Sequence, residues 1–262
     1  MHLLLTNDDG IDCFFLHVLV RALQRHGHDL SIVAPRHEQS WTGASKSRHR
    51  AVTSAREDRG LDCPTWVVDG TPSDCVNIGL AHLLPQGGLA TPDAVVSGIN
   101  MGFNASLGFI NASGTIAGAW EGALHGLPAI AISQDLTFAE FDRLKLAQQG
   151  PSPQLQETLA ISADCAASLV PGLVATTPAQ AFIVHNLNLP FPCRPAATVR
   201  RTVPARVVVP GLFSPAADDG THRFVFSLGV DVSPAEPLTD RAAIAAGDIS
   251  HTVLDYTRLG AL

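Results

Sequence analysis

Two adjacent aspartates near the start of the chain are the first residues whose types suggest chemistry. Only Asn7 separates Asp8 and Asp9 from the short apolar run 3–6, which is typical of a buried β-strand. Neighbouring carboxylates repel each other unless a cation neutralises them. The alternative is that the Asn-Asp-Asp-Gly segment 7–10 is only a turn that caps the next helix. The pair therefore indicates either a cation site or a polar turn.

Three later segments carry oxygen or amide donors, and each follows a predicted strand. They are 38–40 (Glu-Gln-Ser), 70–71 (Gly-Thr) and 98–100 (Gly-Ile-Asn). Ligands of an open parallel sheet gather outside the carboxyl ends of its strands, so these segments should lie near the aspartates. Carboxylates, a hydroxyl and an amide oxygen suit Mg²⁺ or Mn²⁺ better than zinc. We therefore predict a divalent-cation site at this edge.

A Ser-Gly-Thr segment after the glycine-rich loop 98–113 is a second candidate. Ser113 should cap a helix over about 114–125, and the free N–H groups of Gly114 and Thr115 should face outward, where they could bind phosphate. Capping alone is the commoner role of such a serine, and only the nearby cation site favours the phosphate role. The patterns G-x-G-x-x-G, the P-loop and G-x-S-x-G do not occur, which disfavours an oxidoreductase, an NTPase and a serine hydrolase.

The elements that position these residues alternate between short strands and helices. Strands are expected at 3–6, 29–34, 66–68, 94–97 and 129–132, with helices between most of them, followed by a helix at 154–169 and a strand at 182–184. This alternation predicts an α/β fold with a doubly wound, mostly parallel sheet. The segment 200–252 is rich in Val, Pro and Gly, with strand-like runs at 205–209 and 223–228. We predict a catalytic core over 1–199 and a β-rich C-terminal extension over 200–262.

Composition narrows the function classes. The formal net charge is −7, which disfavours binding to a nucleic-acid polymer. No basic leader opens the chain and no run of about 18 apolar residues occurs, so we expect neither a signal peptide nor a membrane span. Five scattered cysteines without a C-x-x-C pair fit reduced thiols and a cytoplasmic protein. The 46% hydrophobic and 16% charged composition suggests that much of the surface is either neutral or hidden in an oligomer.

Several motifs occur in one order along the first 135 residues. They are 4–11 (LLTNDDGI), 33–35 (VAP) followed by Ser40, 70–76 (GTPSDCV), 96–102 (VSGINMG) and 113–115 (SGT) with 121–122 (EG). In this order the chain resembles the survival protein SurE family, the metal-dependent 5′/3′-nucleotidases. Weaker similarity continues in 186–190 and 239–250.

The resemblance implies a Rossmann-like core that holds one divalent metal ion, Mg²⁺ or Mn²⁺. The residues that match the family's metal ligands are Asp8, Asp9, Ser40 and Asn100. The family hydrolyses nucleoside monophosphates, and often other phosphomonoesters, through a metal-activated water without a phosphoenzyme. Its members commonly pair through a C-terminal extension, which here implies a homo-oligomer, a dimer or tetramer, formed through about 200–252.

We assign provisional roles within this scheme. Asp9 is the candidate catalytic residue that contacts the metal and handles a proton, and Asn7 is expected to orient the site. The remaining phosphate oxygens are expected to be held by four residues, Ser45, Ser113, Gly114 and Thr115. The rival hypothesis is a non-catalytic nucleotide- or metabolite-binding module on the same fold.

The loop before Ser-Gly-Thr departs from the family pattern. Residues 104–112 lack the acidic segment and the tyrosine usual in the family, and Trp41 replaces the glycine expected after Ser40. We predict that Trp41, Phe109 and Asn111 line a more apolar substrate pocket, which favours a ring-bearing phosphomonoester. The alternative is that Phe109 and Ile110 are simply core residues under the sheet edge.

Overall fold

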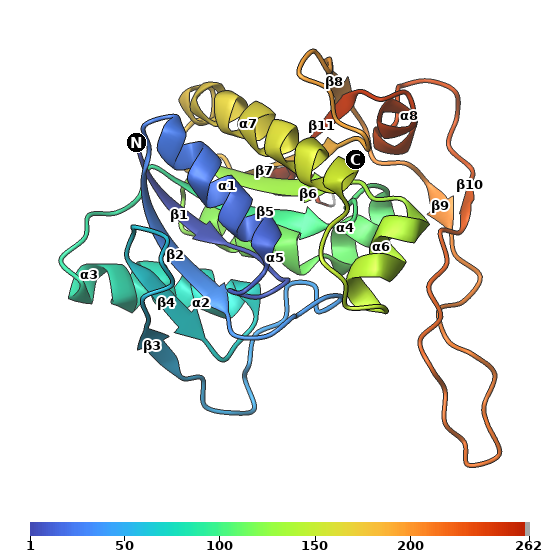
Figure 1. Cartoon of the computed structure of the whole chain (residues 1–262), viewed down its shortest axis with the longest axis horizontal. Coiled ribbons are helices and arrows are strands. Elements are labelled where there is room, and N and C mark those ends of the chain that lie inside the picture. The colour runs from blue at the N-terminus through green and yellow to red at the C-terminus, as the bar shows by residue number, and fades with distance from the viewer. Residues whose placement is uncertain (260–262) are drawn as a thin grey trace.

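The computed structural model describes residues 1–259. The fold is centred on a nine-stranded sheet (Figure 1). The strands lie in the order β3-β4-β2-β1-β5-β6-β7-β11-β8. The bounds are β1 (His2–Thr6), β2 (Asp29–Pro35), β3 (Ser54–Arg56), β4 (Thr65–Val68), β5 (Ala94–Met101), β6 (Ala129–Gln134), β7 (Ile183–Leu189), β8 (Val199–Thr202) and β11 (Ile249–Asp255). The six strands from β4 to β7 run parallel, in the order of a Rossmann-like doubly wound sheet. The predicted fold class is therefore confirmed.

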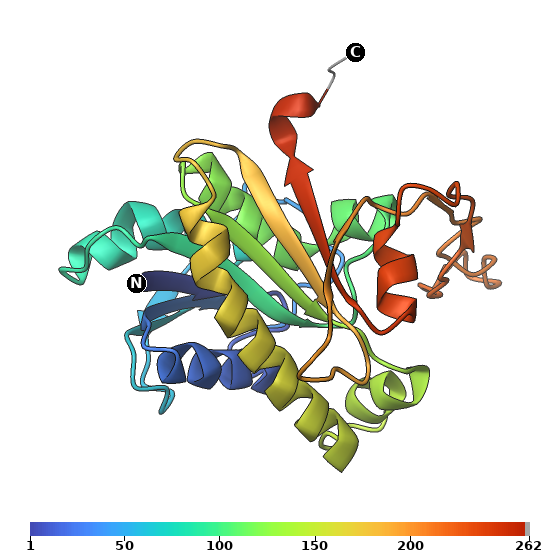
Figure 2. The same ribbon diagram turned by 90° about the horizontal axis from the view of Figure 1, so that it is seen from above.

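Helices cover both faces of the sheet. One face carries α1 (Phe14–Arg25) and α7 (Pro153–Ala175), which pack against each other, and the other carries α2 (Pro72–Ile78) and α5 (Gly114–Leu124) (Figure 2). A π-helical turn, Gly79–Leu83, and the short α3 (Leu84–Gln86) continue α2. Parallel strands buried on both faces must be apolar throughout, and 3–5, 94–96 and 129–132 are fully buried.

Two helix starts confirm the sequence signals. Before α2, the Thr71 hydroxyl accepts a hydrogen bond from the Asp74 N–H (3.1 Å), and the Thr71 N–H donates to the Asp74 carboxylate (2.9 Å). At α5, the Ser113 hydroxyl accepts from the Ile116 N–H (3.1 Å). These caps fix where each helix begins at the edge of the sheet that carries the aspartates.

Three sequence expectations were wrong in detail. The predicted loop 98–113 is shorter, because β5 continues to Met101 and α4 (Leu107–Ala112) forms within it. Helix α6 (Phe138–Lys145) was not predicted. The run 223–228 is not a strand, because the only pairing there is an isolated bridge between Phe213 and Phe224; β9 (Val207–Val208) instead pairs with β10 (Val230–Asp231). The Gly and Asn residues of 98–113 favoured a loop, and the Phe and Val residues of 223–228 favoured a strand.

The last sixty residues divide between the sheet and a projecting arm. Strands β8 and β11 extend the main sheet, and α8 (Asp240–Ala245) precedes β11. We call residues 206–233 the arm; it includes β9 and β10 and extends away from the body of the protein (Figure 1). The boundary between 1–199 and 200–262 stays a prediction.

Helix α7 is long and apolar enough to cross a membrane by length and composition alone. It has 23 residues with a mean hydropathy of 1.6 over its most apolar window. The sequence expectation missed it because Asp, Ser and Pro residues interrupt the apolar run. Its inner side, which includes Leu155, Leu159 and Val170, belongs to the main hydrophobic core and packs toward α1 and β6. That is the position of a helix covering the sheet.

Candidate active site

The candidate site lies where the strand order reverses. From β1 the chain adds β2 and β4 on one side of the sheet and β5, β6 and β7 on the other. The crevice at the carboxyl ends of β1 and β5 is therefore the topological switch point, where ligands of this fold class bind. Only Asn7 separates Asp8 and Asp9 from the end of β1, and Asn100 lies near the end of β5.

Asp8 is held against the start of α5. Its Oδ1 accepts a hydrogen bond from the Thr115 hydroxyl (2.6 Å), and its backbone carbonyl accepts from the Gln39 N–H (2.7 Å). A Cβ on Gly114 would lie 2.8 Å from the Cβ of Asp8. The absence of a side chain at residue 114 is what lets the helix end approach this carboxylate so closely.

Asp9 is the centre of a chain of polar contacts. Its Oδ2 accepts from the Met101 N–H (2.9 Å), and its Oδ1 lies 3.2 Å from the ammonium of Lys145. That ammonium lies 2.8 Å from Glu38 Oε2, and Glu38 Oε1 accepts from the Ser40 hydroxyl (2.7 Å). The contacts connect the ends of β1 and β5 with the loop after β2, as the sequence predicted. Sequence reasoning missed Lys145, which lies 136 residues from Asp9 and carries no local signal.

Burial makes the two carboxylates costly to ionise. Asp8 and Asp9 are almost fully buried, with only 3% of Asp8 and 2% of the Asp9 side chain exposed. Burial, together with the charge of Asp9, raises the pKa of Asp8 to about 7. Burial also raises the pKa of Asp9, although the Lys145 ammonium opposes this rise. A cation in contact with both groups would remove the repulsion that destabilises the ionised pair.

Two asparagines complete the polar set. Asn7 donates from Nδ2 to the Gly10 carbonyl (2.9 Å), while its Oδ1 is buried without a hydrogen-bond partner among residues 1–259. Asn100 donates from Nδ2 to the Gly102 carbonyl (2.7 Å), which leaves its Oδ1 available as an acceptor. Unpartnered buried oxygens are uncommon, and a bound cation or water is one way to satisfy them.

The donor set fits a hard cation. Among residues 1–259 no three His, Cys, Asp or Glu side chains are gathered closely enough to hold a metal by themselves. The two aspartates are instead accompanied by a hydroxyl and amide oxygens, which are ligands typical of Mg²⁺ and Mn²⁺. The Lys145 ammonium already contacts Asp9 as a positively charged partner.

The predicted phosphate-binding residues are placed differently from one another. Ser113 caps α5, and Thr115 is buried with its hydroxyl on Asp8, so this helix end faces the carboxylate instead of open solvent. Ser45 is exposed, and its backbone carbonyl accepts from the Thr71 hydroxyl (2.8 Å). Their phosphate-binding role stays a prediction.

Aromatic rings gather around the same loops. The Trp41 ring centroid lies 5.6 Å from that of Phe109 and 5.0 Å from that of Phe224, and Phe109 lies 5.9 Å from Phe226. Phe103 lies 5.6 Å from Phe109. We call these five rings the aromatic wall; sequence reasoning identified Trp41 and Phe109 but missed the others, two of which come from the arm. Ile110 is instead a core residue, and Asn111 is exposed.

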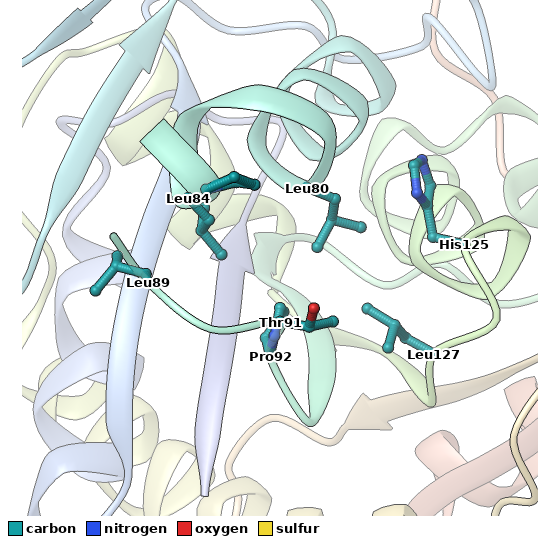
Figure 3. A pocket seen from close by; sticks show the side chains of 8 residues that line it. Leu80, Leu84, Leu89, Thr91, Pro92, His125 and Leu127 are labelled. Carbon is teal, nitrogen blue, oxygen red and sulfur yellow. The ribbon is translucent and has the colours of Figure 1, made fainter. Parts of the chain in front are cut away.

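An apolar pocket at the opposite edge is separate from this site (Figure 3). It has a volume of about 210 Å³ and is lined by leucines that include Leu80, Leu84 and Leu127, with His125 beside them. Thr91 and Pro92, which also line it, precede β5, so the pocket lies at the amino ends of the strands. It contains none of the predicted site residues.

Comparison with known proteins agrees with this geometry. The model of the family described as Survival protein SurE matches residues 3–208. The chain belongs to the SurE family. A relative named 5′-nucleotidase SurE, from Maridesulfovibrio salexigens, is 35% identical over 98% of this chain and 93% of its own length. Another relative of that name, from Desulforudis audaxviator, is 45% identical, and the match spans about half the length of each protein.

A solved SurE structure shows the same fold. The crystal structure of the SurE protein from Aquifex aeolicus matches with a TM-score of 0.71 at 26% sequence identity, covering 100% of this chain and 98% of that one. The aspartate pair, the capped α5 and the Rossmann-like strand order are therefore parts of a SurE protein, and the arm is included in the matched length.

Proposed function

We propose that this protein is a divalent-metal-dependent nucleotidase that hydrolyses nucleoside 5′- or 3′-monophosphates or a similar ring-bearing phosphomonoester. The observation that carries the proposal is the buried pair of carboxylates, Asp8 and Asp9, at the switch point, with Asp8 in contact with the start of α5. Relatives named 5′-nucleotidase SurE, one of them aligned over 98% of this chain, support the reaction class.

Four residues would hold the metal: Asp8, Asp9, Ser40 and Asn100. A bound Mg²⁺ or Mn²⁺ ion would neutralise phosphate oxygens and lower the pKa of a water molecule. Asp9 would contact the metal and accept the proton of the attacking water. Asn7, which is tied to the Gly10 carbonyl, would keep the turn that carries both aspartates in place.

The phosphate would be held at the start of α5. Ser113 caps this helix, Gly114 and Thr115 begin it, and the helix dipole at this end favours an anion. Ser45, exposed on the loop that also contacts Thr71, would complete this set. This arrangement would bind the charge that the phosphate carries into the transition state.

The aromatic wall would select the alcohol part of the substrate. Trp41 has 41% of its surface exposed, and Asn111 is exposed on α4 beside Phe109. Covering apolar surface gains about 25 cal/mol per Å², so stacking a base or another ring on these residues would contribute about 2 kcal/mol. A small phosphate cannot make this contact.

A phosphate-release screen tests the proposal. With Mn²⁺ present, purine and pyrimidine monophosphates should give a higher kcat/KM than glycerol phosphate or polyphosphate. The preference should shrink in Trp41→Gly and in Phe109→Ala, whereas Phe213→Ala should retain it, because Phe213 contacts only Phe224 among the rings described. A preference for small phosphates that survives the first two substitutions would contradict the proposed specificity. Tight nucleotide binding without phosphate release under any divalent metal would favour the non-catalytic binding module.

We also propose that the protein acts as a homo-oligomer, a dimer or tetramer, formed through segment 200–262. Support comes from the arm, on which several large apolar side chains are exposed, namely Val208, Phe213, Val225, Val230 and Val232. Exposed large apolar side chains that are concentrated in one segment are typical of an interaction site. Cytoplasmic location, and the absence of membrane or nucleic-acid partners, stay predictions.

A further inference from the structure

Lys145 has no role in the proposed reaction, yet it contacts the site directly. It is the last residue of α6, and its ammonium lies 3.2 Å from Asp9 Oδ1 and 2.8 Å from Glu38 Oε2. Its side chain is 21% exposed, so these contacts are partly shielded from solvent. Because this partly buried ammonium contacts a predicted metal ligand, it would repel a cation that approaches Asp9.

Helix α6 is otherwise loosely attached to the protein. None of its residues is buried, and Phe138 and Phe141 are 64% and 40% exposed. Leu144 packs partly against the core, and Arg143 hydrogen-bonds only within the same segment, to the Gly150 carbonyl (2.7 Å). The ion pairs of Lys145 are therefore a principal connection between α6 and the sheet edge.

The ammonium and a divalent cation compete for the same oxygen atoms. Asp9 offers Oδ1 to Lys145 and Oδ2 to the Met101 N–H, so both of its oxygens already have donors. An ion bound by Asp8 and Asp9 would need an Asp9 oxygen, and Oδ1 is the one that contacts a side chain instead of a backbone N–H. Two cations in contact with the same carboxylate oxygen lie close together and repel each other strongly.

We propose that Lys145 is an internal cation that the divalent ion must displace from Asp9, so that metal loading exchanges one cation for another and removes one of the two ion pairs that attach α6. This inference rests on the proposed metal-dependent function. The displaced ammonium keeps Glu38 as a partner, which also holds Ser40, so the exchange links metal occupancy to the loop after β2. Lys145 thereby lowers the affinity of the protein for the metal.

Calorimetric titration with Mn²⁺ alone, without substrate, tests this exchange. Lys145→Met should bind Mn²⁺ at least tenfold more tightly than wild type, a factor that corresponds to about 1.4 kcal/mol. Lys145→Arg keeps the positive charge and should stay within threefold of wild type. Arg143→Met removes a cation from the same helix that does not touch the aspartates, and it should leave the affinity unchanged.

Hydrogen exchange gives a second readout that does not depend on activity. In wild type, Mn²⁺ should accelerate exchange of backbone amides in 138–145, and in Lys145→Met these amides should exchange quickly even without metal. Equal or weaker Mn²⁺ affinity in Lys145→Met, or α6 protection that increases with metal, would overturn the proposal. If wild type and every variant fail to bind Mn²⁺, the metal-dependent function itself is contradicted, and this inference with it.

Discussion

Replacing Asp8 with asparagine should stabilise the metal-free protein while abolishing its response to metal. The pKa of the buried Asp8 carboxyl is raised from 3.8 to about 7, chiefly by burial and then by the charge of Asp9. A carboxyl whose pKa rises on folding destabilises the folded state once the pH exceeds the pKa of that group in the unfolded chain. The loss of folding free energy is complete when the pH exceeds its pKa in the folded protein. The cost is thus absent below pH 3.8 and full at pH 8.

The magnitude follows from this difference in pKa. A rise from 3.8 to about 7 corresponds to about 4 kcal/mol at pH 8. Asparagine is neutral and retains an oxygen that can accept from the Thr115 hydroxyl, so the hydrogen bond at 2.6 Å can persist. Asp9 also ionises more easily once its neighbour is neutral, so part of the added stability comes from Asp9. We expect Asp8→Asn to add about 1–4 kcal/mol at pH 8 and almost nothing near pH 4.

Urea unfolding of EDTA-treated protein at both pH values measures the effect. Asp12→Asn is a matched control in the same loop, because the Asp12 side chain is 74% exposed and its loss should change stability little at either pH. Added Mn²⁺ should stabilise wild type and Asp12→Asn but not Asp8→Asn. Equal or lower stability of Asp8→Asn at pH 8, or undiminished stabilisation by Mn²⁺, would refute the reasoning about this carboxylate pair.

Three further outcomes are expected. Gly114→Ala should lower kcat/KM by about tenfold to a hundredfold, because its Cβ would lie 2.8 Å from that of Asp8, whereas Gly172→Ala, whose Cβ meets no atom within 4 Å, should not; equal kcat/KM values would contradict this. Burial lowers the pKa of His185 and of His251 to about 4, so that the unfolded chain takes up protons at a higher pH than the folded protein. Wild type should therefore lose stability relative to His251→Gln as the pH falls from 6.5 to 4. A difference in unfolding free energy that stays constant over this range would be inconsistent with this. Light scattering should give the mass of a dimer or tetramer of the 27.6 kDa chain, and a monomer at micromolar concentration would count against the proposed oligomer.

Much of the core could be predicted because its signals are local. A buried strand that ends at paired aspartates, and the capping box of Thr71 and Asp74, depend on residues within a few positions of one another. The parallel order then follows from the alternation of strands and helices, which places segments 38–40 and 98–100 at the edge that carries the aspartates. In the structure the Gln39 N–H donates to the Asp8 carbonyl, and the N–H of Met101, next to Asn100, donates to the Asp9 carboxylate, so both segments lie at this edge.

The features that sequence reasoning missed depend on distant contacts. Lys145 meets Asp9 across 136 residues, and no property of its own helix indicates that contact. Helix α4 begins at a segment whose Ser106 N–H donates to the Asp240 carboxylate (2.8 Å), a support that lies 134 residues away. Phe224 and Phe226 lie on the arm, far along the chain from Trp41, yet their rings pack against it. Such contacts are set by tertiary packing and leave no periodic pattern in the chain.

Metal dependence of phosphate release is the most direct test of the central claim. Protein stripped with EDTA and dialysed should release no phosphate from a nucleoside monophosphate, and adding Mn²⁺ or Mg²⁺ should restore turnover in wild type but not in Asp8→Asn. Full turnover in excess EDTA, or an Asp8→Asn variant that matches wild type at modest Mg²⁺, would contradict a reaction that depends on a divalent cation held by this aspartate pair.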